Sequence, residues 1–289
     1  DHRDLHSFPT RRSSDLTIPP DIHQNNQLQQ RSLYFYYRDK LLKGDKLPDW
    51  RDTGFRVFSQ SDEDGLLLYI FSLIGFSNRL LLDVASGSPY GGNSTNLIVN
   101  WGFNGLLVEN NNKLINRTVS FYSRHPDAQL YPPKTRRAWI TVENINQIIA
   151  EEGVSGEIDL FSLDVDGIDY WLWKGLEVIS PRVVVVEYQD MFFAEESVTV
   201  PYKPDFNRFA VHPDFFGASL AAFAKLANIK GYRLVGCNRY GYNAFFIRND
   251  LAQNILPEVS VDSCLVHPKI LEGCINKRSN AAHLLWEVV

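Results

Sequence analysis

The stretch RLLLDVASGSPYGGNSTNLIVNWGFNGLLVENNN, residues 79–112, decides the fold of this chain. It begins with an apolar run that ends in Asp83, as expected of a buried parallel strand. A turn rich in glycine follows, and residues 93–95 can cap the helix that the next apolar residues predict. A second apolar run then ends in Glu109. This order of strand, glycine-rich turn, helix and strand predicts the βαβ unit with which Rossmann-like sheets hold a nucleoside.

The glycines of the turn limit the kind of nucleoside that the loop can hold. Gly87, Gly91 and Gly92 do not have the spacing G-x-G-x-x-G that binds a dinucleotide pyrophosphate. A nucleoside without a pyrophosphate needs less from the loop, and S-adenosylmethionine (SAM) is the common example. An acid at the end of the second strand, here Glu109, can accept hydrogen bonds from both ribose hydroxyls. A glycine-rich turn after a strand is also often only a turn, so the motif leaves both roles open.

Two later apolar runs repeat the pattern of a strand that ends in an acid. IDLFSLD ends in Asp164 and RVVVVE ends in Glu187. The carboxyl ends of parallel strands meet at one crevice, so we expect these two acids to lie there with Asp83 and Glu109. Asp164 also begins the sequence DVDGID, which contains two further acids.

Periodicity and turn signals predict the remaining elements. The predicted helices are residues 62–75, 112–122, 144–151, 170 onward and 217–229, and the further strands are 138–142, 232–237 and 243–248. The last two strands form a hairpin, so one strand must run antiparallel to the others. Ser61 or Asp62 is expected to cap the first helix, a structural reading that we prefer to a metal site in the acidic run. The aromatic, proline-rich segment 191–214 is expected to be a lid or a wall of the substrate site.

The composition of the chain limits the classes of function that it can have. Its 289 residues are 44% hydrophobic, enough for one core, and the net charge of −5 with no basic patch argues against nucleic acid as a partner. The three cysteines form no CxxC motif, which favours a reducing compartment, and we expect a cytoplasmic protein. The longest apolar run, residues 66–71, is far shorter than the roughly 18 residues of a membrane span.

The chain divides into four predicted segments. Residues 1–16 look like the translation of a sequencing-adapter oligonucleotide, so we expect an artefactual, disordered and dispensable tail. Residues 17–55 are predicted to be an N-terminal helical arm, residues 56–250 the main α/β domain, and residues 251–289 a C-terminal extension.

Over roughly residues 56–250 the chain resembles the class I SAM-dependent methyltransferases, and within them FkbM-type proteins and their uncharacterised bacterial relatives. The resemblance is carried by SQSDEDG, LLDVASG with NSTNLI, GLLVENN, FSLDVDGIDYWLWKGL, VVVVEY, GASLAAFAKLA and GYRLVGCNRYGYNAFFIRND. It implies an α/β fold, a Rossmann-like three-layer sandwich whose seven-stranded, mostly parallel sheet has the order 3-2-1-4-5-7-6. The seventh strand, last in sequence, is antiparallel, which agrees with the predicted hairpin.

The resemblance also implies a cofactor site. Asp83 and Gly87 would lie at the amino-acid end of SAM, Glu109 at the ribose and Asp164 beside the methyl group. The full set of cofactor-binding residues is expected to be Asp83, Ala85, Ser86, Gly87, Glu109, Asn110 and Asp164. The usual loop reads acid-x-Gly-x-Gly-x-Gly, and here Ala85 and Pro89 replace the first and third glycines.

Methyl transfer requires alignment of donor and acceptor, and a base when the acceptor is a hydroxyl. Asp164, Asp166 and Asp169 are the candidate bases or, alternatively, ligands of Mg²⁺, which prefers oxygen, and Glu187 is a further candidate ligand. His212 in the predicted lid is a further candidate base. The predicted function is therefore O-methylation of a small-molecule or glycan acceptor.

Other readings stay open. Asp164-Val165-Asp166 is also a DxD motif, typical of metal-dependent nucleotide-sugar glycosyltransferases, although the first βαβ unit argues against that class. The replaced glycines leave room for a non-catalytic Rossmann-like binding protein. Asp166 can simply be a turn residue, Asp169 a helix cap and His212 a surface histidine.

Overall fold

A computed structural model of the chain describes residues 20–289, with side chains from residue 24 onward. The expected dispensable tail, residues 1–16, lies outside the described residues. Within the described part, no helix is both long and apolar enough to cross a bilayer.

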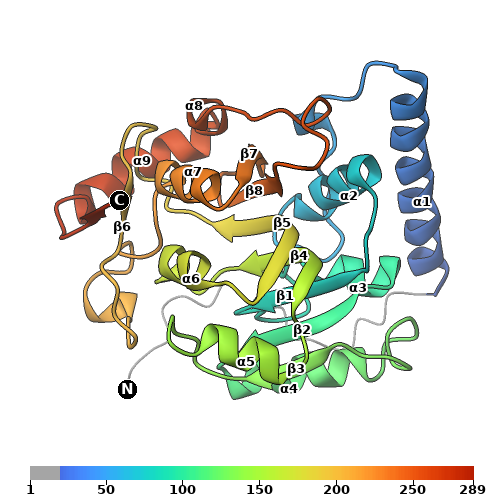
Figure 1. The fold of residues 1–289 in the computed structure, drawn as a ribbon, viewed down its shortest axis with the longest axis horizontal. Helices are drawn as coiled ribbons and strands as arrows, with labels where there is room; N and C mark the ends of the chain where they lie inside the picture. Colours follow the sequence, from blue (N-terminus) through green and yellow to red (C-terminus); the bar gives the residue numbers. More distant parts are fainter. Residues whose placement is uncertain (1–19) are drawn as a thin grey trace.

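A seven-stranded sheet forms the centre of the molecule (Figure 1). Its strands are β1 (Leu80–Val84), β2 (Asn104–Glu109), β3 (Lys134–Arg137), β4 (Gly156–Leu163), β5 (Ile179–Glu187), β7 (Tyr232–Cys237) and β8 (Asn243–Arg248). They are arranged in the order β3-β2-β1-β4-β5-β8-β7, and only β8 is antiparallel to its neighbours. Counted along this sheet, the order is 3-2-1-4-5-7-6, so the expected Rossmann-like methyltransferase topology is confirmed.

Helices cover both faces of the sheet, and each face has its own core. The helices are α1 (Pro20–Lys43), α2 (Glu63–Ile74), α3 (Thr95–Trp101), α4 (Asn112–Tyr122), α5 (Ile145–Glu151), α6 (Asp169–Gly175), α7 (Leu220–Ile229), α8 (Val261–Cys264) and α9 (Pro268–Ala281). Within β1, Leu82 and Val84 pack with α5, α6 and α7, whereas Leu81 packs with α1 to α4 on the other face. This alternation is the two-residue period of a strand buried on both sides.

The long segment after β5 and the C-terminal extension pack together. β6 (Val198–Thr199) and β9 (Glu287–Val288) pair as a small antiparallel ribbon. Lys277 of α9 donates to Asp190 at 2.6 Å, and the Arg278 guanidinium binds both carboxylate oxygens of Glu196. Two short 3-10 helices, Trp50–Asp52 and Arg208–Ala210, complete the described elements.

The third strand differs from its prediction. Residues 138–142 were expected to form it, but β3 comprises the preceding Lys134–Arg137. β3 is an edge strand that pairs only with β2, so its exposed, polar sequence KTRR lacks the apolar signal of an inner strand. The apolar residues 138–142 instead leave the sheet, and Ile140 is buried there.

The start of α2 also differs in detail. The helix begins at Glu63 and ends before Gly75 as expected, but the Asp62 side chain makes no capping hydrogen bond. The Asp64 carboxylate instead accepts the backbone N–H groups of residues 57–59, so the acidic run fixes the chain that leads into the helix. Asp62 therefore occupies the N-cap position without making the expected side-chain hydrogen bond, and Ser59 Oγ instead accepts the N–H of Asp64 at 3.3 Å.

Candidate functional site

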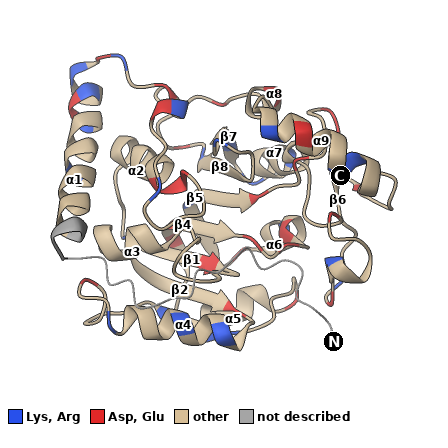
Figure 2. Cartoon of the chain, turned by 180° about the vertical axis from the view of Figure 1, so that it is seen from behind, with Lys and Arg blue, Asp and Glu red and all other residues tan. Residues whose placement is uncertain are grey.

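Acidic residues mark the carboxyl ends of four adjacent strands. Asp83 is the penultimate residue of β1, and Glu109 is the last residue of β2. Asp164 directly follows β4, and Glu187 is the last residue of β5. Figure 2 shows acidic colouring at the arrowheads of β1, β2 and β5. Because β2, β1, β4 and β5 are consecutive parallel strands, their acids share one edge of the sheet.

Asp83 is a buried acid that holds the start of α3. Its Oδ2 accepts a hydrogen bond from Ser94 Oγ at 2.6 Å, and its side chain is 3% exposed. Burial, partly offset by hydrogen bonds from Ser94 and Ser162, raises the pKa of Asp83 to about 7. The side chain therefore changes charge near neutral pH.

The glycine-rich turn after β1 folds back on β2. Ala85 has φ = +60° and Gly87 has φ = +61°, both in the left-handed region. The backbone N–H of Ser86 donates to the Val108 carbonyl at 3.1 Å. Ala85 thus takes a backbone conformation that favours glycine, and it does so with a Cβ in place.

Glu109 ties this turn to the end of β2. Its Oε2 accepts the N–H of Gly87 at 3.0 Å and its Oε1 accepts the N–H of Asn111 at 2.8 Å. Each carboxylate oxygen can accept more than one hydrogen bond, so both remain able to bind hydroxyl groups. Glu109 and Asn110 also form part of the wall of a cavity.

This cavity lies between the ends of β1 and β2 and the loops after β3 and β4. Its lining residues are Val84, Ala85, Val108, Glu109, Asn110, Ala138, Trp139, Ile140, Val165, Gly167, Ile168 and Phe206. The volume is about 80 Å³, well below the roughly 300 Å³ at which ligand pockets usually begin. Phe206 closes one side by packing on Gly167, and Trp139 Nε1 donates to the Pro204 carbonyl at 2.7 Å. The loop after β3, mistaken for a strand in the sequence, is thus part of the site.

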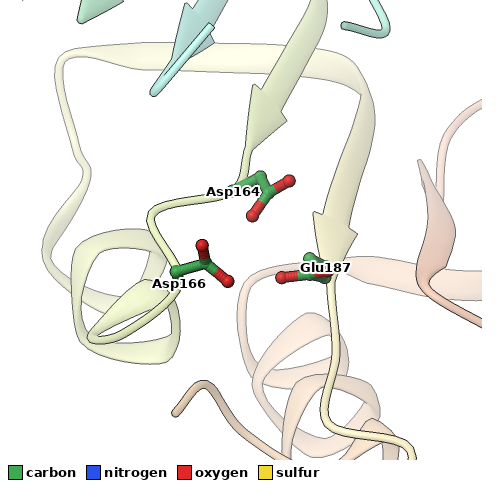
Figure 3. Close-up of side chains that lie close together, drawn as sticks. All are labelled: Asp164, Asp166 and Glu187. Carbon is green, nitrogen blue, oxygen red and sulfur yellow. The ribbon is translucent and has the colours of Figure 1, made fainter. Parts of the chain in front are cut away.

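Three carboxylates meet beside the cavity. Oxygens of Asp164, Asp166 and Glu187 all lie within 4.8 Å of one another, and Figure 3 shows the side chains directed toward a common point. Burial, with the nearby charges of Asp166 and Asp169, raises the pKa of Asp164 to about 7. Burial and the charge of Asp164 raise the pKa of Glu187 well above its ordinary value. Burial and the closeness of these carboxylates thus disfavour the charged form of both Asp164 and Glu187.

The loop that carries Asp164 is held by Asp169. Its carboxylate accepts the N–H of Val165 at 2.7 Å and that of Gly167 at 2.9 Å. Burial raises the pKa of this side chain to about 6, against the lowering effect of the two backbone donors. Asp169 is thus a structural residue at the start of α6, but it is not the helix cap, because Ile168 occupies that position and the Asp169 carboxylate binds the preceding loop.

Residues 201–216 lie over the cavity, and we call them the covering segment. From this segment Arg208, rather than His212, contacts one of the three carboxylates. Arg208 Nη1 donates to Asp166 Oδ1 at 2.6 Å. His212 Nδ1 accepts the N–H of Asp214 at 3.1 Å, and among the described residues no hydrogen bond or ion pair joins it to Asp164, Asp166 or Glu187. No sequence signal points to Arg208, because the register of a loop over a site cannot be read from periodicity.

No protein-family model matches the chain, and no curated protein sequence matches it. Among solved structures it is similar to magnesium protoporphyrin IX methyltransferase (ChlM) from Synechocystis PCC 6803 with bound SAM, at 13% identity and a TM-score of 0.40, over 76% of this chain and 96% of that one. It is also similar to the N-terminal domain of EvdMO1 with SAH bound, at 12% identity and a TM-score of 0.41, over 75% of this chain and 94% of that one. The CcbJ methyltransferase from Streptomyces caelestis gives 13% identity and a TM-score of 0.39, over 70% of this chain and 99% of that one. The sheet order given above rests on the strand pairings of this chain alone.

Proposed function

We propose that this chain is a SAM-dependent methyltransferase of the FkbM type that O-methylates a small molecule or glycan. The observation that carries the proposal is a cavity at the carboxyl edge of the sheet, with Glu109 in its wall and three carboxylates beside it. Val165 and Gly167 belong both to the cavity wall and to the loop between Asp164 and Asp169, so they connect the two.

The residues of the cavity suit a nucleoside. Glu109 offers acceptor oxygens for ribose hydroxyls, and Ile140, Val165, Ile168 and Phe206 offer apolar contacts for a base. Bound SAM supplies an electrophilic methyl group. In the proposal, Asp83 and the turn around Gly87 hold the amino-acid end, and Ser86 and Asn110 border the ligand.

The small volume of the cavity gives the covering segment a role in binding. Phe206 lies on Gly167, and Arg208 anchors the same segment to Asp166. Admission of a nucleoside therefore requires residues 201–216 to move outward and then close again. Such closure excludes water from the reacting groups.

Asp164 is the proposed base. Its pKa of about 7 lets it accept a proton from an acceptor hydroxyl at neutral pH, and Glu187 lies beside it with a pKa raised well above its ordinary value. The alternative role is a Mg²⁺ site formed by Asp164, Asp166 and Glu187, whose oxygens suit that ion. His212 would enter only through a rearrangement of its segment.

Calorimetry with S-adenosylhomocysteine (SAH) tests the proposal. We expect the parent to bind SAH and Glu109→Gln to bind it about 10- to 100-fold more weakly, because the charged acceptor is lost. Glu272→Gln is the matched control, since Glu272 is exposed on α9, and its affinity should equal that of the parent. Absence of binding in the parent, or equal affinity in a folded Glu109→Gln variant, would refute the cofactor assignment.

The three-carboxylate cluster also favours a second candidate, a nucleotide-sugar glycosyltransferase that uses the Asp164-Val165-Asp166 motif with a metal. Titration with a uridine diphosphate sugar in the presence of Mn²⁺ separates the two. Binding of that sugar without binding of SAH would select the glycosyltransferase. Binding of SAH without methyl transfer to any acceptor would instead favour a non-catalytic relative.

A further inference from the structure

A second cavity lies on the opposite side of the sheet from the acidic edge. It has a volume of about 380 Å³ and lies between α1, the approach to β1 and the end of α3. We call it the α1 pocket; its lining residues are Arg31, Tyr34, Phe35, Phe76, Arg79, Trp101 and Gly102. In Figure 1 the strand arrowheads point away from α1, so the α1 pocket is remote from the proposed methyl-transfer site.

Packed aromatic rings form the floor of the α1 pocket. Tyr34 stacks on Phe76 with centroids 5.6 Å apart and planes 6° apart, and Trp101 lies 5.2 Å from Tyr34 and 5.7 Å from Phe76. Phe35 stands at the rim with 66% of its side chain exposed. Phe35 also makes an edge-to-face contact with Tyr34, so the pocket offers an apolar floor and a largely exposed ring beside it.

Two arginines flank the rings. The Arg31 guanidinium lies 5.6 Å from the centre of Trp101, and the Arg79 guanidinium lies 5.0 Å from the centre of Phe76. Among the side chains described, residues 24–289, no carboxylate forms an ion pair with either arginine. A guanidinium that stacks on a ring keeps its N–H edge free for an anion.

The position of Arg79 is fixed by the backbone. Its φ of +55° is in the left-handed region, which costs a non-glycine residue about 1 kcal/mol or more. The buried Asp159 carboxylate accepts the Arg79 N–H at 2.7 Å and the N–H groups of residues 77 and 78 at 3.0 Å. The fold thus holds a strained residue in place and directs its cation to the pocket.

We propose that the α1 pocket binds a phosphorylated ring compound of the nucleoside monophosphate class. The two guanidiniums, which form no ion pair with the side chains of residues 24–289, match the two negative charges of a phosphate monoester better than the single charge of a carboxylate. The exposed Phe35 ring can stack on a base. The volume lies within the roughly 300–1,000 Å³ range of ligand pockets, and no part of this inference depends on the methyltransferase assignment.

Calorimetry with uridine monophosphate, in the presence of saturating SAH, tests the proposal without interference from the adenosine site. We expect uridine monophosphate to bind at least about 10-fold more tightly than uridine or inorganic phosphate, because only the monophosphate uses both the rings and the arginines. Arg31→Gln and Phe35→Ala should each weaken binding by about 10-fold. Arg117→Gln on the exposed face of α4 is the matched control and should bind like the parent.

Three results would overturn the proposal. The parent fails to bind uridine monophosphate, the Arg31→Gln variant binds it as tightly as the parent, or inorganic phosphate binds as tightly as the nucleotide. Arg31 and Phe35 are both exposed, so the two variants should keep the parent melting temperature, and Arg79→Asn adds a third variant that tolerates the left-handed backbone. Equal binding by all three folded variants would place any bound nucleotide elsewhere on the protein.

Discussion

The guanidinium of Arg208 donates a hydrogen bond of 2.6 Å to the carboxylate of Asp166, and this ion pair joins the segment over the cavity to the loop after β4. Arg208 also stacks on Phe216 at 4.5 Å. The pair is partly exposed, with 23% of Arg208 and 55% of Asp166 accessible, so its contribution to global stability should be small.

We therefore expect Arg208→Gln to loosen the segment while leaving the melting temperature nearly unchanged. Exposed ion pairs contribute about 0–1 kcal/mol, but residues 201–216 have few other anchors to the carboxylate loop. Hydrogen exchange of these amides should be faster in Arg208→Gln than in the parent, and SAH should associate faster. Asp166→Asn removes the other half of the ion pair and should have the same effect. Asparagine tolerates the φ of +56° at this position while it removes the charge. Unchanged exchange in both variants would show that the ion pair does not hold the segment.

The left-handed backbone of Ala85 gives a second prediction. Ala85→Gly should stabilise the protein by up to about 1 kcal/mol, because glycine adopts a φ of +60° without the clash of a Cβ. The substitution also removes a side chain from the wall of the cavity, so SAH affinity should stay equal or rise. Urea unfolding with and without SAH measures both effects. Ala150→Gly within α5 is the control and should destabilise by roughly 0.5–1 kcal/mol; equal losses in both variants would refute the strain argument.

The pKa of Asp83 gives a prediction about pH. Its value is raised from 3.8 to about 7 by burial, so the native state binds more protons than the unfolded state between these limits. The contribution of Asp83 to the free energy of unfolding therefore falls as the pH rises from about 4 to about 7 and is flat above that window. Asp83→Asn removes the titration, and relative to the parent it should gain about 2–3 kcal/mol between pH 5 and pH 8.

Urea unfolding of apo protein at several pH values measures this difference. Asp45→Asn, a substitution at an exposed position after α1, is the control and should follow the parent across the range. A parallel pH dependence in Asp83→Asn and the parent would show that Asp83 is ionised in the native state throughout. Below about pH 4 the Asp83 carboxyl is protonated in both the native and the unfolded state. Its titration therefore adds no difference in stability between the parent and Asp83→Asn there.

Most of the sheet was predictable because its inner strands are buried on both faces. The runs that become β1, β2, β4 and β5 are mostly apolar, and each has an acid at or beside its carboxyl end. The hairpin of β7 and β8 followed from its turn. The prediction missed β3 because this edge strand carries polar side chains. Residues 138–142 were wrongly predicted to be a strand because apolar side chains among them line the cavity and do not belong to the sheet.

The candidate site was predictable only in part. Strand order places Asp83, Glu109, Asp164 and Glu187 on one edge, since parallel strands must align their ends. Nothing local places Arg208 against Asp166, because 42 residues and an irregular loop separate them. The α1 pocket was also invisible, since its walls come from helix α1, a loop and the end of α3, and such meetings depend on tertiary packing.

The last prediction concerns metal binding by Asp164, Asp166 and Glu187. If their clustered oxygens hold a divalent cation, Mn²⁺ should raise the melting temperature of the parent, since a ligand of the native state at 100 times its Kd stabilises by about 2.7 kcal/mol. Glu187→Gln should abolish the rise, whereas Arg208→Gln should increase it, because the guanidinium no longer competes for Asp166. Glu272→Gln is the control and should respond like the parent. No response of the parent to Mn²⁺ would contradict the metal site, and the role of Asp164 as a base would then be the proposal to test.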